Sequence, residues 1–164
     1  MKKIFKFSNG KGFSLVELLL TMSVIAILIG ISTMNFTGIQ HKTTLAATVD
    51  GLVANLSQQQ IKAMVGDTEG RQVLDNYGVY FGATSYTLFN DIYYSTGSAN
   101  FSENLPASQQ VTSTFSNSQI IFQKGSGEIL NYDPLQSSIS VQDLTSGEQK
   151  IIQFNRYGVI TSIN

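Results

Sequence analysis

The hydrophobic pattern divides the chain into two parts. Between residues 13 and 31 the sequence reads FSLVELLLTMSVIAILIGI and is almost continuously apolar. Apolar residues then recur at three- and four-residue steps, which is the spacing of one helix face. The members of this stripe are Leu45, Val49, Leu52, Val53, Leu56, Ala63 and Met64. The pattern predicts one long helix from about Ser14 to about Val65, ended by Gly66 and Asp67, with its second half packed against a sheet.

Beyond Gly70 the pattern changes to short β-branched and aromatic runs separated by Gly, Asn, Asp and Ser. Such runs are typical of strands. The predicted strands are 77–81, 86–89, 119–123, 129–132, 138–144, 150–154 and 157–163. Tight hairpin connections are expected at 145–148 and 155–156, and the polar stretch 95–118 is expected to be a long loop. The predicted fold class is therefore α+β, a long helix followed by an antiparallel β domain.

Composition narrows the function classes. Only 13% of the 164 residues are charged, against roughly 25% in an average soluble domain. The deficit is filled by 19 Ser, 14 Thr, 11 Asn and 13 Gln, together 57 residues. This mixture argues against a charge-rich disordered tail and against a basic nucleic-acid binder. The absence of Cys removes disulfides, thiolate metal sites and thiol nucleophiles.

Charge is distributed unevenly along the chain. Residues 1–12 contain four Lys and no acid, which gives +4, and the remaining residues carry 6 basic and 11 acidic side chains, which gives −5. The 19-residue apolar run would be about 28 Å long as a helix, enough to cross a bilayer core. Lysines on its N-terminal side would keep residues 1–11 cytoplasmic and send the C-terminal bulk outward. We therefore predict a single pass through the inner (cytoplasmic) membrane.

Three interpretations of this segment compete: a cleaved secretory signal, an ordinary anchor and a more specific signal. A secretory signal would need a small-residue cleavage site, and no A-x-A-like site follows Ile31. An ordinary anchor leaves Glu17 unexplained, because a carboxylate inside an apolar span costs about 3 kcal/mol even on lenient insertion scales. No Lys, Arg or His lies within the span to pair with it.

The string KGFSLVE at residues 11–17 closely resembles the class III signal of the type IV pilin superfamily. The resemblance implies that a prepilin peptidase cuts between Gly12 and Phe13, leaving 164 − 12 = 152 residues. It also implies methylation of the new amino group of Phe13. In such fibres the residue corresponding to Glu17 is thought to pair with the N-terminal amine of a neighbouring subunit. A buried charge that gains its partner only in the polymer would favour assembly and fix its register.

The strings YGVYFG…YTLF and IIFQKGSGEI…IIQFNRYGVITSI are similar to those of H-type minor pseudopilins and related minor pilins. This likeness implies two antiparallel sheets packed on the helix. The expected regions are a cleaved leader at 1–12, a transmembrane or fibre-core half-helix at 13–38, an amphipathic half-helix at 39–66 and an outer β domain at 67–164. The implied partners are other pilin or pseudopilin subunits, prepilin peptidase and the inner-membrane assembly platform.

Nothing in the sequence indicates catalysis. His41 is the only histidine, so it has no second imidazole for a dyad or a metal site. The motifs G-x-S-x-G, H-E-x-x-H and the P-loop lysine are all absent, and the Gly-Ser-Gly at 125–127 is expected to form a hairpin turn. Two carboxylate pairs lack the dense ligand spacing of a calcium loop, namely Asp67 with Glu69 and Asp133 with Asp143. We predict no catalytic residue, no cofactor and no metal.

The charge balance of the outer part of the chain argues against nucleic-acid binding. Residues 40–164 contain six basic and ten acidic side chains, a balance of −4, whereas duplex binding needs several cations. Only a local patch from Lys150 and Arg156 remains conceivable. The sequence thus predicts a non-enzymatic minor subunit of a type IV pilus or a type II secretion pseudopilus. The alternatives are an unprocessed bitopic membrane protein with a ligand-binding β domain, and a minor pilin for DNA uptake or adhesion.

Overall fold

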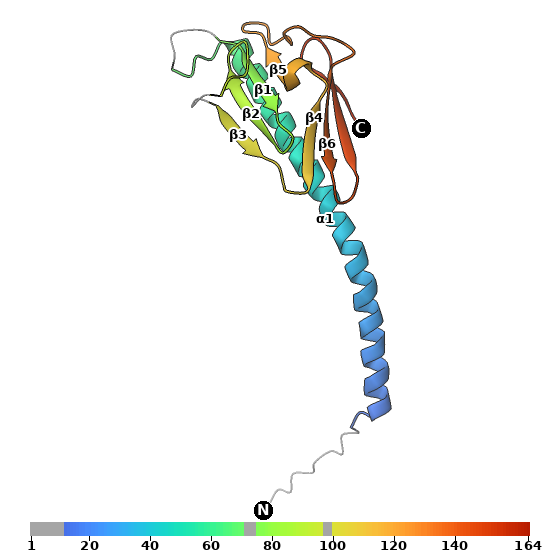
Figure 1. The fold of residues 1–164 in the computed structure, drawn as a ribbon. Coiled ribbons are helices and arrows are strands. Elements are labelled where there is room, and N and C mark those ends of the chain that lie inside the picture. The colour runs from blue at the N-terminus through green and yellow to red at the C-terminus, as the bar shows by residue number, and fades with distance from the viewer. Residues whose placement is uncertain (1–11, 71–74, 97–99) are drawn as a thin grey trace, which may run out of the picture. The chain divides into compact units, whose positions relative to one another are not determined.

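A computed structural model describes residues 12–70, 75–96 and 100–164, and between 31 and 43 it describes the backbone alone. It contains one long helix and two four-stranded antiparallel sheets (Figure 1). The predicted α+β class with two sheets is confirmed. The chain divides into two compact units, residues 1–39 and 40–164.

The helix α1 runs from Leu15 to Val65, one residue from the predicted start and at the predicted end. Gly66 stops it in the left-handed conformation, with φ of 67°. The N–H of Asp67 donates to the carbonyl of Lys62 at 3.0 Å, and that of Gly66 to the carbonyl of Ala63 at 3.4 Å. This is the Schellman arrangement, in which glycine accepts a positive φ at no steric cost.

Each sheet has four strands. The first has the order β3-β2-β1-β5, and its strands are β1 (Tyr77–Phe81), β2 (Ser85–Asn90), β3 (Phe101–Asn104) and β5 (Gln119–Phe122). The second has the order β4-β6-β7-β8, and its strands are β4 (Gln109–Ser113), β6 (Ser138–Asp143), β7 (Gln149–Phe154) and β8 (Ile160–Ile163). A short 3₁₀ turn, η1 (Ser116–Ser118), connects β4 to β5.

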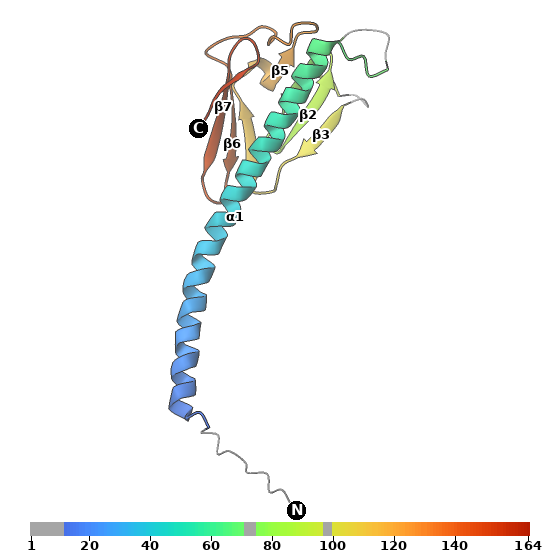
Figure 2. The ribbon, with the colours of Figure 1, turned by 180° about the vertical axis from the view of Figure 1, so that it is seen from behind.

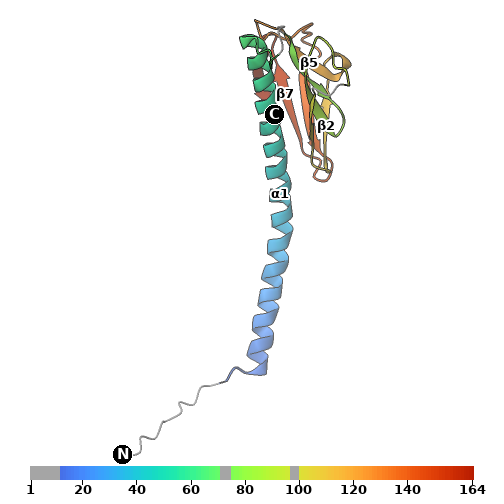
Figure 3. The same ribbon diagram turned by 90° about the vertical axis from the view of Figure 1, so that its left-hand side faces the viewer.

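The part of α1 in the second unit lies across both sheets (Figure 2), and the side view shows both sheets on the same side of the helix (Figure 3). The helix contributes a stripe of almost fully buried residues, namely Leu45, Val49, Leu52, Leu56 and Ala63. The sheets contribute alternate residues of their strands, among them Val79, Ile120, Val141 and Ile152. The amphipathic pattern and the period-2 pattern therefore meet in one core.

The expectation of a long loop at 95–118 was wrong. This stretch contains β3, β4 and η1. All four residues of β3 are exposed, and β4 is polar apart from Val111, so neither strand has the alternating apolar pattern that would reveal it. Their pairing comes from backbone hydrogen bonds to β2 and β6, which any sequence without proline can supply.

The prediction of a strand at 129–132 was also wrong, because only Ile129 pairs with another strand residue. Only a single bridge, between Phe122 and Ile129, is present, and Asn131 then turns the chain with φ of 54°. The last strand begins at Ile160 because Asn155 and Val159 close a turn before it, N–H to carbonyl at 3.0 Å. The hairpin connections at 145–148 and 155–156 and the turn at 125–127 are confirmed.

Candidate functional site

The first turn of α1 is closed by a serine cap. The hydroxyl oxygen of Ser14 accepts a hydrogen bond from the backbone N–H of Glu17 at 3.2 Å, and its carbonyl accepts from the N–H of Leu18 at 3.1 Å. Ser14 is therefore the N-cap and Glu17 holds the third helical position, the spacing of a capping box. The sequence signal for this cap is the S-x-x-E spacing at 14–17.

Glu17 consequently has a local role besides the one predicted for assembly. A carboxylate in the first turn is stabilised by the helix dipole by about 0.3–1 kcal/mol at an exposed site. No ion pair to its carboxylate occurs among the residues that the structure describes. Its position in the helix is therefore favourable by itself, while its charge is available to a group outside the chain.

The segment that follows exposes apolar side chains on all sides. Twelve large apolar residues between 13 and 29 have exposed fractions of 49–77%: Phe13, Leu15, Val16, Leu18, Leu19, Leu20, Met22, Val24, Ile25, Ile27, Leu28 and Ile29. A helix that is apolar all round belongs in an interior. An exposed surface of this kind marks an interaction site with protein or membrane.

The hydroxyl groups in this segment do not require a partner outside it. The Thr21 hydroxyl donates to the Leu18 carbonyl at 3.0 Å, and the Ser23 hydroxyl to the Leu20 carbonyl at 2.8 Å. Hydroxyls bonded to their own helix add little cost to burial in an apolar surrounding. Glu17 is thus the one side chain between 13 and 30 whose burial demands a counter-charge.

Two other observations concern this part of the chain. A side chain built on Gly12 would meet no described atom within 4 Å, and both Gly12 and Phe13 are exposed. Among the described residues, no helix combines the length and the apolar character needed to cross a membrane. The predicted span at 13–38 extends past the residues whose side chains are described, and His41 and Lys42 lie outside them too.

Comparison with known families gives one match in this region. Residues 7–33 match the prokaryotic N-terminal methylation motif. The motif is that of a type IV pilin-like class III signal peptide, and it includes Gly12, Phe13 and Glu17. Such a motif is typical of pilin-like substrates of prepilin peptidase, which are anchored in the membrane and assemble with other pilin subunits. No curated protein and no solved structure matches the chain.

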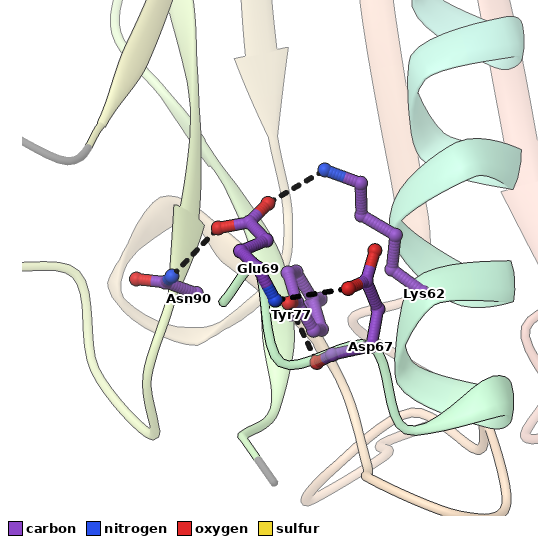
Figure 4. A network of polar contacts seen from close by, with 5 residues as sticks. All are labelled: Lys62, Asp67, Glu69, Tyr77 and Asn90. Atoms are coloured by element: carbon purple, nitrogen blue, oxygen red, sulfur yellow. Dashed lines mark hydrogen bonds and ion pairs between the residues drawn. The ribbon is translucent and has the colours of Figure 1, made fainter. Parts of the chain in front are cut away.

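In the β domain, the first candidate carboxylate pair forms a structural clasp (Figure 4). One carboxylate oxygen of Glu69 pairs with Nζ of Lys62 at 2.6 Å, and the other accepts from the Asn90 amide at 3.0 Å. Asp67 caps the same turn by accepting the N–H of Glu69 at 2.9 Å, and its carbonyl accepts the hydroxyl of Tyr77 at 2.8 Å. These contacts bind the end of α1 to β1 and β2 and give both carboxylates partners within the chain.

The second candidate pair serves two separate turns. Asp133 accepts the N–H of Leu135 at 2.9 Å, whereas buried Asp143 accepts the N–H groups of Thr145 and Ser146 at 2.8 and 3.0 Å. Within the part of the chain that the structure describes, no three His, Cys, Asp or Glu side chains gather where they could hold a metal.

The conceivable basic patch of Lys150 and Arg156 is weakened by an acidic neighbour. The guanidinium of Arg156 lies 3.4 Å from the carboxylate of Glu128, which partly neutralises it. Lys150 is half-buried on β7 opposite Val141. The pair therefore presents little free positive charge to a phosphate backbone.

Proposed function

We propose that this protein is a structural minor pilin or pseudopilin, with no enzymatic chemistry of its own. It is inserted in the inner membrane by residues 13–38, cut between Gly12 and Phe13, methylated at Phe13 and then assembled into a type IV pilus or a type II secretion pseudopilus. The observation that carries the proposal is the methylation motif at 7–33 directly before an apolar segment that is exposed on every side.

Burial supplies the driving force for this role. The apolar side chains of residues 13–29 gain free energy in any interior, at about 25 cal/mol per Å² removed from water. Lipid and the packed helices of a fibre are both such interiors, so transfer from one to the other costs little hydrophobic energy. Charge then favours the fibre, because Glu17 meets there the α-amine that cleavage creates on a neighbour.

The role as a minor subunit rests on the β domain. Two sheets on one side of the helix match the arrangement expected of H-type minor pseudopilins. A surface rich in hydroxyl and amide groups suits contacts with other subunits outside the cell. Such a domain would decide which neighbours the subunit meets.

Co-expression with a prepilin peptidase tests the proposal. We expect intact mass to fall by twelve residues and N-terminal sequencing to begin at methylated Phe13. Gly12→Val should abolish cleavage, because a β-branched side chain next to the scissile bond obstructs the enzyme. Gly30→Ala is the matched control, since a side chain at either glycine meets no atom within 4 Å. A mature N-terminus other than Phe13 would contradict the proposal.

The assembly step needs its own variant. Glu17→Gln keeps the shape of the side chain and removes its charge, so we expect normal cleavage and membrane insertion but loss of incorporation into fibres. Asp50→Asn, which removes an exposed acid from the same helix, is the control and should assemble normally. Normal incorporation of the Glu17 variant would show that its charge plays no part in assembly.

A further inference from the structure

A groove of about 210 Å³ lies on the face of the first sheet that points away from α1. Its floor is Ile121 of β5, whose neighbours Ile120 and Phe122 point into the core, together with Phe115 before η1. One wall is the segment 92–93 and the other is the loop 130–136. The volume is below the roughly 300–1,000 Å³ of pockets for drug-sized ligands, so it suits a single ring with its substituents.

The first wall is rigid and carries an exposed aromatic ring. Tyr94 stacks on Tyr80 with centroids 4.1 Å apart and planes 5° apart, and its N–H donates to the Gln119 side chain at 3.0 Å. These contacts hold the preceding residue in place, yet Tyr93 itself is 64% exposed. A ring held on such a backbone can stack on a ligand at a small cost in conformational entropy, because its backbone is already ordered.

The polar groups around this ring are planar amides. Asn117 of η1 and Asn131 of the opposite loop both line the groove. Both lie in the left-handed region, with φ of 56° and 54°, which asparagine adopts more readily than most residues other than glycine. Within the described residues neither amide makes a hydrogen bond. Each therefore offers one acceptor and two donors from a fixed backbone.

The charge of the groove restricts its ligand. Asp133 is the only charged residue among the eleven that line it, and no cation is present among them. Anionic ligands such as phosphates, nucleic acids or acidic sugars would meet a carboxylate and no counter-charge. A neutral ligand with many hydroxyl groups fits better, because amides and a carboxylate bind hydroxyls and an aromatic face attracts the polarised C–H groups of a ring.

We propose that this groove binds a neutral pyranose unit of a glycan, which stacks on Tyr93 and hydrogen-bonds to Asn117, Asn131 and Asp133. The groove lies entirely in the second unit, so this binding is independent of processing and assembly and goes beyond the proposed function.

The test is an NMR titration of the full chain in detergent micelles with two neutral probes, N-acetylchitotriose and maltotriose. At about 10 mM probe, ten times the ~1 mM Kd of a weak complex, at least one of them should shift the side-chain amide signals of Asn117 and Asn131. The anionic 3′-sialyllactose and an unstructured Gly-Ser peptide should leave these signals unchanged. No shift with either neutral probe, or shifts with the peptide instead, would overturn the proposal.

Variants distinguish this groove from unspecific sugar contact. Tyr93→Ala should abolish the shifts and Tyr93→Phe should retain them, because stacking needs the ring and not the hydroxyl. Tyr157→Ala, which removes a tyrosine of similar exposure (62%) outside the groove, should bind as the parent does. Glycine adopts the positive φ of position 117 without strain, so Asn117→Gly should keep the fold. The affinity for the sugar probe should fall about fivefold, because one hydrogen bond is lost. Shifts that persist in Tyr93→Ala would refute the assignment.

Discussion

The two stretches of α1 show how one helix can carry two kinds of apolar surface. In the second unit Leu45, Leu52 and Leu56 are 1–2% exposed, while most of the described polar residues around the helix are exposed or half-buried and only Gln59 among them is buried. Between 13 and 29 the leucines and isoleucines are 52–75% exposed, and almost no polar residue separates them. The first pattern is satisfied within the chain, and the second requires an interior that the chain does not provide.

This difference implies a division of work. The amphipathic stretch stabilises the β domain by packing on its sheets. The apolar stretch attaches the domain to a membrane or to a fibre. Substitutions in the two stretches should therefore separate folding from assembly.

The largest expected difference is between the effects of Leu52→Ala and Leu19→Ala on the free energy of unfolding. We expect Leu52→Ala to lower the free energy of unfolding by about 2–5 kcal/mol, because it opens a cavity between the helix and the sheets. Leu19→Ala, at a residue 60% exposed, should change it by about 0.5 kcal/mol or less while reducing incorporation into fibres. Urea unfolding of the full chain in a mild detergent measures the first effect. Equal destabilisation by both variants would contradict the division.

Glycines test how tightly the sheet is packed. A side chain at Gly78 would lie 2.6 Å from the ring of Phe89 and 2.7 Å from the carbonyl oxygen of Ile120. We expect Gly78→Ala to destabilise the domain by about 1–3 kcal/mol. Gly51, on the exposed face of α1, meets no atom within 4 Å, so Gly51→Ala should stabilise by about 0.5–1 kcal/mol. Thermal unfolding distinguishes them, and a neutral result at Gly78 would mean that the sheet face can yield.

The serine cap gives a smaller and local effect. Ser14→Ala removes the acceptor for the Glu17 N–H and should weaken the first turn of α1 by about 1 kcal/mol. Amide hydrogen exchange at residues 17–19 should rise about fivefold, with the unfolding of the β domain unchanged. Ser57→Ala, at an exposed position inside the helix, should not increase exchange. Unchanged exchange in the Ser14 variant would show that the turn does not depend on this cap.

The smallest effect concerns pH. Burial raises the pKa of Tyr86 above its ordinary value of 10.0, opposed by the hydrogen bond from Asn55 and supported by the charge of Glu103. The folded state therefore holds this proton more tightly than the unfolded state, and the contribution is fully present below pH 10. It should be lost as the pH rises through the raised value, so stability should decline there. Tyr86→Phe should show a shallower decline in unfolding experiments above pH 10, and an identical slope would rule out this linkage.

Much of the fold was predictable because its elements follow simple periodicities. The helix and its end at Gly66 were correct, as were strands such as β1 and β6 within one residue, since apolar spacing and turn residues specify them. The strands β3 and β4 were missed, because polar edge strands depend on backbone pairing. The burial of Gln109, which lies opposite Asp143 and is 0% exposed, could not be predicted from the sequence either. Glutamine is ordinarily a surface residue.

The candidate sites divide in the same way. Gly12, Phe13 and Glu17 could be named from the sequence, because they lie within seven consecutive residues and share one motif. The groove could not, because Tyr93, Asn117 and Asn131 are separated along the chain and converge only when β5 and its flanking loops are in place.

By itself, the sequence determined a basic N-terminal segment, a pilin-like signal motif and a helix with an apolar start, since each is a local property of consecutive side chains. Only the tertiary structure decided that Asp67 and Glu69 clasp the end of α1 to the sheet, that Arg156 pairs with Glu128, and that aromatic and amide groups line one groove together with Asp133. Those outcomes depend on contacts between residues far apart in the chain, which side-chain periodicity does not encode.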